Sequence, residues 1–181
     1  MFDTLVAVVY ILSLLQTTKR RRIDMLMPLL LGCATVFVTM SVQIAALVYM
    51  LQYLLKILDR SEDRFFSKLQ TTYVISMVMM TLFVGHIVQV AIWAGLFMRL
   101  GEFGDFSTAY YHSMVNFASL GYGDIVMSPT WRLLGAIEAS TGVLMFGVSA
   151  GVMLAVMSRI LTQDARFRGR LDDIKLKDHH Q

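Results

Sequence analysis

Cysteine is almost missing from this chain, which has a single one, Cys33, among its 181 residues. One thiol cannot close a disulfide within the chain, so a disulfide framework is excluded. Charged residues are also few, at 16% of the sequence, whereas hydrophobic residues make up 56%. A soluble domain of this size cannot bury that much apolar surface, so the composition predicts a membrane protein.

Three long stretches carry almost no charge. Residues 25–55 and 69–98 contain no charged residue, and residues 133–158 contain only Glu138. Each stretch exceeds the ~20 residues that a helix needs to cross a bilayer. We therefore predict an all-α integral membrane protein with three main spans.

The basic residues lie beside these apolar stretches. The net charge of +3 and the pI near 9.1 would also suit a nucleic-acid-binding protein. Lipid headgroups explain the clustering better, so we expect membrane lipids as partners and no nucleic acid. Residues 4–18 are apolar but short, and Lys19–Arg22 follow them, which favours a helix at the membrane surface.

The pattern divides the chain into four segments. They are an apolar and basic N-terminal extension (1–24), the first span (25–58), a segment with the second and third spans (69–161) and a polar tail (162–181).

The region between the second and third spans contains a short helix. Gly101–Asp105 interrupts the helical pattern, and Asp105 or Ser107 is suited to cap a new helix that ends near Phe117. This helix is too short to cross the membrane. Its last carbonyl groups are expected to be unsatisfied and to carry partial negative charge, which stabilises a nearby cation.

The six residues after this helix, Ser119–Asp124, read Ser-Leu-Gly-Tyr-Gly-Asp. Glycine enters backbone conformations that other residues avoid, so Gly121 and Gly123 allow successive carbonyl groups to face the same way. A ring of such carbonyls from several chains can replace the water shell of a potassium ion. The hexapeptide resembles the TVGYGD signature of potassium-channel selectivity filters.

The order of span, short helix, glycine-containing segment and span is similar to the pore domain of the potassium-channel superfamily. The resemblance is nearest to small bacterial channels with an extra leading span, and residues 110–115 and 131–135 share in it. It implies that residues 69–161 form an outer helix, a re-entrant pore helix, a filter and an inner helix. One filter copy per chain implies a homotetramer, in which each chain supplies one quarter of the ring.

The resemblance also implies roles for particular residues. Asp124 is expected to hydrogen-bond to Tyr111 and to support the filter from behind, and Val115 and Asn116 are expected to support the filter as well. Potassium is expected at Ser119, Leu120, Gly121 and Tyr122. Main-chain oxygens for ion coordination would come from Ser119, Leu120, Gly121, Tyr122 and Gly123.

Other residues of the spans allow two interpretations each. Gly142 and Gly147 are candidates for a hinge that opens a gate, or they allow close helix packing. His86 and Glu138 are polar groups that need partners in the membrane. They are a candidate pair, which either holds two spans together or makes opening sensitive to pH.

The resulting hypothesis is a passive potassium-selective channel in the plasma membrane of a bacterium. We expect no enzymatic activity and no cofactor, and we expect potassium as the permeant ion. A weakly selective cation channel is one alternative, because Ala118 and Ser119 stand where the family commonly has two threonines. A non-conducting regulatory subunit is the other. A filter facing outward would leave Lys19–Arg22 outside, against the tendency of basic residues to stay inside.

Overall fold

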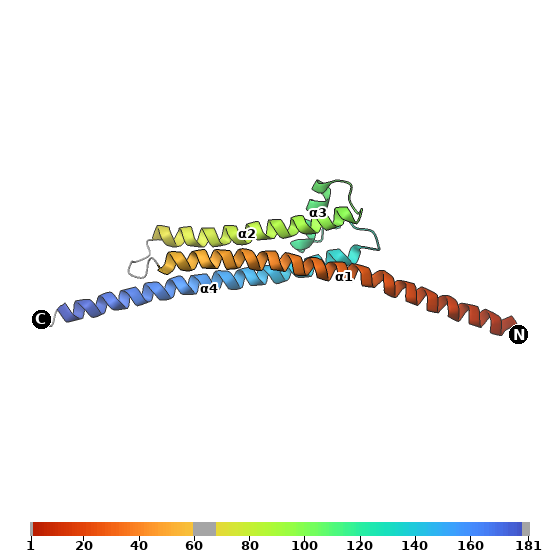
Figure 1. Cartoon of the computed structure of the whole chain (residues 1–181), viewed down its shortest axis with the longest axis horizontal. Coiled ribbons are helices and arrows are strands. Elements are labelled where there is room, and N and C mark those ends of the chain that lie inside the picture. Colours follow the sequence, from red (N-terminus) through yellow and green to blue (C-terminus); the bar gives the residue numbers. More distant parts are fainter. Residues whose placement is uncertain (1, 60–67, 179–181) are drawn as a thin grey trace. The chain divides into compact units, whose positions relative to one another are not determined.

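The computed structural model describes the backbone of residues 2–59 and 68–178, and the side chains of residues 25–56 and 69–162. This part of the chain forms the helices α1 (Phe2–Asp59), α2 (Lys68–Arg99), α3 (Phe106–Phe117) and α4 (Arg132–Asp178), which are drawn in Figure 1. No β-strand occurs in the described backbone. The predicted all-α fold is confirmed.

Three of these helices are long and apolar enough to span a membrane. The spans are Met25–Lys56 in α1, Leu69–Arg99 in α2 and Arg132–Thr162 in α4, with mean hydropathies of 2.0, 2.0 and 1.9. The remaining helix, α3, has 12 residues. At ~1.5 Å per residue it is about 18 Å long, which is shorter than the ~30 Å hydrocarbon core. The protein is therefore a multi-pass membrane protein with three candidate spans.

α1 is a single helix where the sequence predicts two segments. It continues from Phe2 to Asp59 without a break, through the predicted boundary at residue 24 and through Pro28. Proline removes one helical hydrogen bond, but its fixed φ is compatible with a helix. A change from basic to apolar side chains does not by itself end a helix. The surface position predicted for residues 4–18 depends on side chains outside the described ones and stays a prediction.

The chain forms two compact units, of residues 1–38 with 91–142 and of residues 39–90 with 143–181. In the second unit, α1, α2 and α4 contribute core residues spaced four apart, which places them on one face of each helix. In lipid such a core is held by close packing, because the surrounding acyl chains are as apolar as the side chains. The core residues are Met50, Leu54, Val74, Val78, Leu82, Val156 and Ile160.

The core of the first unit is aromatic. Trp93 and Phe97 of α2 pack with Met127 of the following loop and Leu134 of α4, and all four are buried. The ring centroids of Trp93 and Phe97 lie 5.9 Å apart, and Phe97 also contacts Phe103 at 6.4 Å. This cluster joins the end of α2 to the start of α4, so it fixes the two ends of the segment that contains α3.

Candidate functional site

α3 begins directly after Asp105, one of the two residues predicted to cap it. Asp105 is the N-cap residue, with an extended backbone, and its carboxylate accepts a hydrogen bond from the Thr108 N–H at 2.8 Å. This bond is the main cause that lowers the pKa of Asp105, because an ionised carboxylate is the better acceptor. A negative charge at this position also complements the dipole at the start of the helix.

The end of α3 is closed by two further main-chain hydrogen bonds. The Ser119 N–H donates to the Asn116 carbonyl at 2.8 Å, and the Leu120 N–H donates to the Val115 carbonyl at 2.9 Å. Together with the positive φ of 57° at Ser119, these two bonds form a Schellman motif. Glycine usually occupies the position that Ser119 has here, because a β-carbon is strained at positive φ.

This closure changes one expectation from the sequence. The last carbonyl groups of α3 were expected to lack partners, but those of Met114, Val115 and Asn116 accept bonds from Ala118, Leu120 and Ser119. The physical reason is the sharp left-handed turn at Ser119, which brings the next N–H groups back over the helix end. Each carbonyl keeps a second lone pair, and the dipole of α3 still points its negative end at residues 119–123.

The backbone of residues 119–123 alternates in the sign of φ. Ser119, Gly121 and Gly123 have φ values of 57°, 59° and 72°, whereas Leu120 and Tyr122 lie outside the positive region. Alternation of this kind gathers successive N–H groups on one side of the chain and leaves the carbonyl oxygens on the other. A β-carbon at Gly121 or Gly123 would meet open space, so these positions require glycine for the backbone conformation and not for room.

The hydrogen bond expected between Tyr111 and Asp124 is present. The Tyr111 hydroxyl donates to Oδ2 of Asp124 at 2.8 Å, which connects α3 to the end of the glycine-containing segment. The bond raises the pKa of Tyr111, because it stabilises the neutral phenol that donates it.

A second connection between α3 and this segment was missed by the sequence analysis. Nδ1 of His112 lies 3.1 Å from the Ile125 carbonyl oxygen, and Nε2 of His112 lies 2.9 Å from Nδ2 of Asn116. A neutral imidazole with its proton on Nδ1 satisfies both contacts, since the carbonyl only accepts. Burial is the main cause that lowers the pKa of His112 and so favours this neutral form. Asn116, which was predicted to support the filter, therefore contacts His112.

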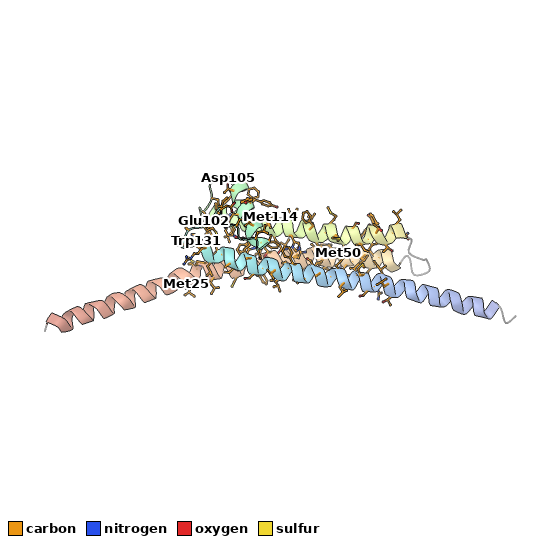
Figure 2. The ribbon with its side chains drawn as sticks, turned by 180° about the vertical axis from the view of Figure 1, so that it is seen from behind. Met25, Met50, Glu102, Asp105, Met114 and Trp131 are labelled. Atoms are coloured by element: carbon orange, nitrogen blue, oxygen red, sulfur yellow. The ribbon has the colours of Figure 1, made fainter. Side chains whose placement is uncertain are left out.

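The loops before α3 and after residue 124 are joined by Glu102. Its two carboxylate oxygens accept hydrogen bonds from the main-chain N–H and the hydroxyl of Ser128, at 2.7 and 2.6 Å. Figure 2 labels Glu102, Asp105 and Trp131 in the part of the structure that contains these loops. The two acidic side chains thus have different partners, because Glu102 accepts hydrogen bonds from Ser128 whereas Asp105 caps α3.

The two candidate hinge glycines have different surroundings. Gly142 is buried, and a β-carbon there would collide with the main-chain carbonyl of Phe117, so close packing accounts for this glycine. Gly147 is exposed in the single chain, and a β-carbon there would meet nothing within 4 Å. The hinge prediction therefore remains only for Gly147.

His86 and Glu138 each have a hydrogen-bond partner other than the predicted one. Nε2 of His86 lies 2.9 Å from the Ser149 hydroxyl oxygen, and Nδ1 of His86 lies 3.4 Å from the amide nitrogen of Gln89. Glu138 accepts a hydrogen bond from the hydroxyl of Ser113 in α3. The contact of His86 links the spans α2 and α4, and the bond of Glu138 links α4 to the short helix α3, while the sensitivity of opening to pH stays a prediction.

A comparison with family models finds one match, to a family described as an ion channel, over residues 76–159. The matched segment contains most of α2, all of α3, residues 119–124 and the first part of α4. The match supports an ion channel of the pore-domain family. Families of this kind are typically oligomeric and interact with ions. No curated protein and no solved structure matches the chain.

Proposed function

We propose that this channel is a homotetramer that conducts potassium passively and selectively across the plasma membrane. Its ion path is lined by the main-chain carbonyls of Ser119, Leu120, Gly121, Tyr122 and Gly123, which we call the filter. A potassium ion at Ser119 to Tyr122 exchanges its hydration shell for carbonyl oxygens from four chains. The protein needs no cofactor and catalyses no reaction.

The observation that carries this proposal is the alternating φ over residues 119–123. Five residues in this conformation cannot pair as a strand, and their carbonyl oxygens need a partner on one side. Irregular backbone at membrane depth is tolerated where protein buries it or where it lines a watery path. A row of cations on a central axis supplies the partner, and neighbouring chains supply the burial.

The surface of the single chain supports several copies around that axis. Leu120 and Tyr122 are large hydrophobic side chains, yet they are 52% and 64% exposed in the single chain. A hollow of about 520 Å³ also opens beside Gly121 and Gly123, between the end of α3 and the start of α4. A ring of identical chains closes both features, since each chain covers the filter of the next.

The test is the reversal potential of the purified protein in liposomes with potassium on one side and sodium on the other. We expect a strong preference for potassium, and we expect Gly121→Ala to abolish it, because alanine is strained at φ 59°. Gly101→Ala is the matched control, since Gly101 has φ 75° but lies outside the filter. Equal loss of selectivity in both variants would contradict the proposal.

A weakly selective cation channel is favoured by one observation, the presence of Ala118 and Ser119 in place of two threonines. The same recording decides between the two, because a weakly selective pore gives a reversal potential near zero. Tetramers that carry no current at all, in wild type and in Gly121→Ala alike, would indicate a non-conducting subunit.

A further inference from the structure

Glu138 is a fully buried acidic side chain near the start of the membrane span Arg132–Thr162 in α4. Its exposed fraction is 0%, and so is that of Ser113, whose hydroxyl donates to Oε1 of Glu138. The side-chain amide of Asn116 also lies against this carboxyl group, whose second oxygen, Oε2, has no short hydrogen-bond partner among the described residues. A buried carboxyl group costs free energy that an apolar side chain would not cost, so its presence indicates a function.

The surroundings of Glu138 form a continuous contact between α4 and the end of α3. Gly135, Glu138, Ala139 and Gly142 are spaced as one stripe along α4, and we call this stripe the α3–α4 seam. At Gly135 a β-carbon would lie 3.0 Å from the Asn116 amide, and at Gly142 it would collide with the Phe117 carbonyl. The small residues of the seam therefore bring the two backbones close together.

Within this seam Glu138 is the only long side chain. The filter begins directly at the same contact, because the Ser119 hydroxyl points to the Ala139 carbonyl at a long 3.5 Å. The bond from Ser113 to Glu138 fixes the rotation of α3 about its axis and its depth along α4. The main-chain bonds of the Schellman motif attach Ser119 and Leu120 to the end of α3, so the position of α3 determines where the carbonyl groups of these two residues lie.

We propose that Glu138 is a positioning residue that holds the filter in its potassium-selective geometry through Ser113. The side chain does not touch the permeating ion. It acts on α3, and α3 sets the spacing of the first carbonyl rings. This inference rests on the proposed function, since it explains how the selectivity of the filter is maintained.

The test compares three substitutions in liposome recordings. Glu138→Gln keeps an oxygen that accepts from Ser113, so we expect the sodium-to-potassium permeability ratio to stay within about twofold of wild type. Glu138→Leu and Ser113→Ala remove the bond, and each should raise the ratio about tenfold. The double variant, Ser113→Ala with Glu138→Leu, should raise the permeability ratio no further than either single variant, because both substitutions remove the same interaction.

Thr141→Val is the matched control. Thr141 is also buried in α4, but its hydroxyl donates to the Ile137 carbonyl of its own helix at 2.8 Å. We expect a permeability ratio like that of wild type. A wild-type ratio in Glu138→Leu, or an equal loss in Glu138→Gln and Glu138→Leu, would overturn the proposal.

A second measurement separates this inference from the proposed function. Hydrogen exchange of the Ser119 and Leu120 amides in the intact detergent-solubilised protein should accelerate about tenfold in Ser113→Ala, and not in Thr141→Val. Unchanged exchange would overturn the role of Glu138 even in a selective channel. Wild-type protein that fails to discriminate potassium from sodium would instead overturn the proposed function, while faster exchange in Ser113→Ala would still support the positioning role.

Discussion

Adding one methyl group at Gly142 tests whether α4 must approach the end of α3 at backbone distance. The new β-carbon would collide with the Phe117 carbonyl, which belongs to the main chain and cannot rotate away. Overpacking of this kind costs about 1–3 kcal/mol, whereas replacing glycine by alanine in a helix gains about 1 kcal/mol. The net result is a loss of up to about 2 kcal/mol in each chain.

Gly147→Ala is the natural comparison, because a β-carbon at Gly147 meets nothing within 4 Å of the single chain. Here only the helix propensity acts, so the variant should be more stable by up to about 1 kcal/mol. The assay is the fraction of intact oligomer that remains after stepwise heating, measured by gel filtration. We expect the midpoint to fall for Gly142→Ala and to stay or rise for Gly147→Ala.

Equal midpoints for the two variants would refute the close approach of α4 to Phe117. The same proteins also test the remaining hinge candidate, since a hinge at Gly147 loses flexibility when it becomes alanine. Fewer openings in single-channel recordings of Gly147→Ala, with an unchanged midpoint, would support that role. Wild-type openings would leave packing between subunits as the reason for this glycine.

Three further predictions concern single side chains. Ser119→Gly removes a strained β-carbon at φ 57° and should raise the stability of the oligomer by about 1–2 kcal/mol in the heating assay, and an unchanged midpoint would contradict the strain. Gln43→Leu leaves the buried Gln89 amide without the acceptor that it has at 2.9 Å, at a cost of about 1 kcal/mol, and Gln43→Leu with Gln89→Leu should recover part of this loss. The pKa of His112 is lowered on folding, so its neutral form contributes stability that is fully present above about pH 6.5 and is lost on acidification. Heating curves between pH 8 and pH 5 should show this dependence, and His112→Gln should flatten it.

The features that the sequence predicted well are local or periodic. The three spans follow from apolar stretches longer than a bilayer is thick, and the start of α3 follows from the capping chemistry of Asp105. The bond between Tyr111 and Asp124 was expected from the family resemblance alone, because nothing in the spacing of two residues 13 apart requires them to meet.

The contacts that the sequence did not reveal join residues across the filter segment. Glu102 and Ser128 are 26 residues apart, and His112 meets a main-chain carbonyl, which carries no sequence signal. The closure of α3 was missed for a different reason. Its left-handed position is occupied by Ser119, and helix ends of this type are recognised from sequence by glycine.

The family match begins at residue 76, so it leaves out α1, yet α1 makes close contacts with helices inside the match. In the first unit, a β-carbon at Gly32 of α1 would lie 2.6 Å from the Ile137 side chain of α4. In the second unit, a β-carbon at Gly85 of α2 would collide with the Gln43 amide of α1. Small residues at such contacts let two helix backbones approach closely, and the buried Gln43 of α1 accepts a hydrogen bond from Gln89 of α2. A fragment without α1 would expose that Gln89 amide to lipid, where an unpaired polar group is costly. The leading helix is therefore a constituent of the membrane fold.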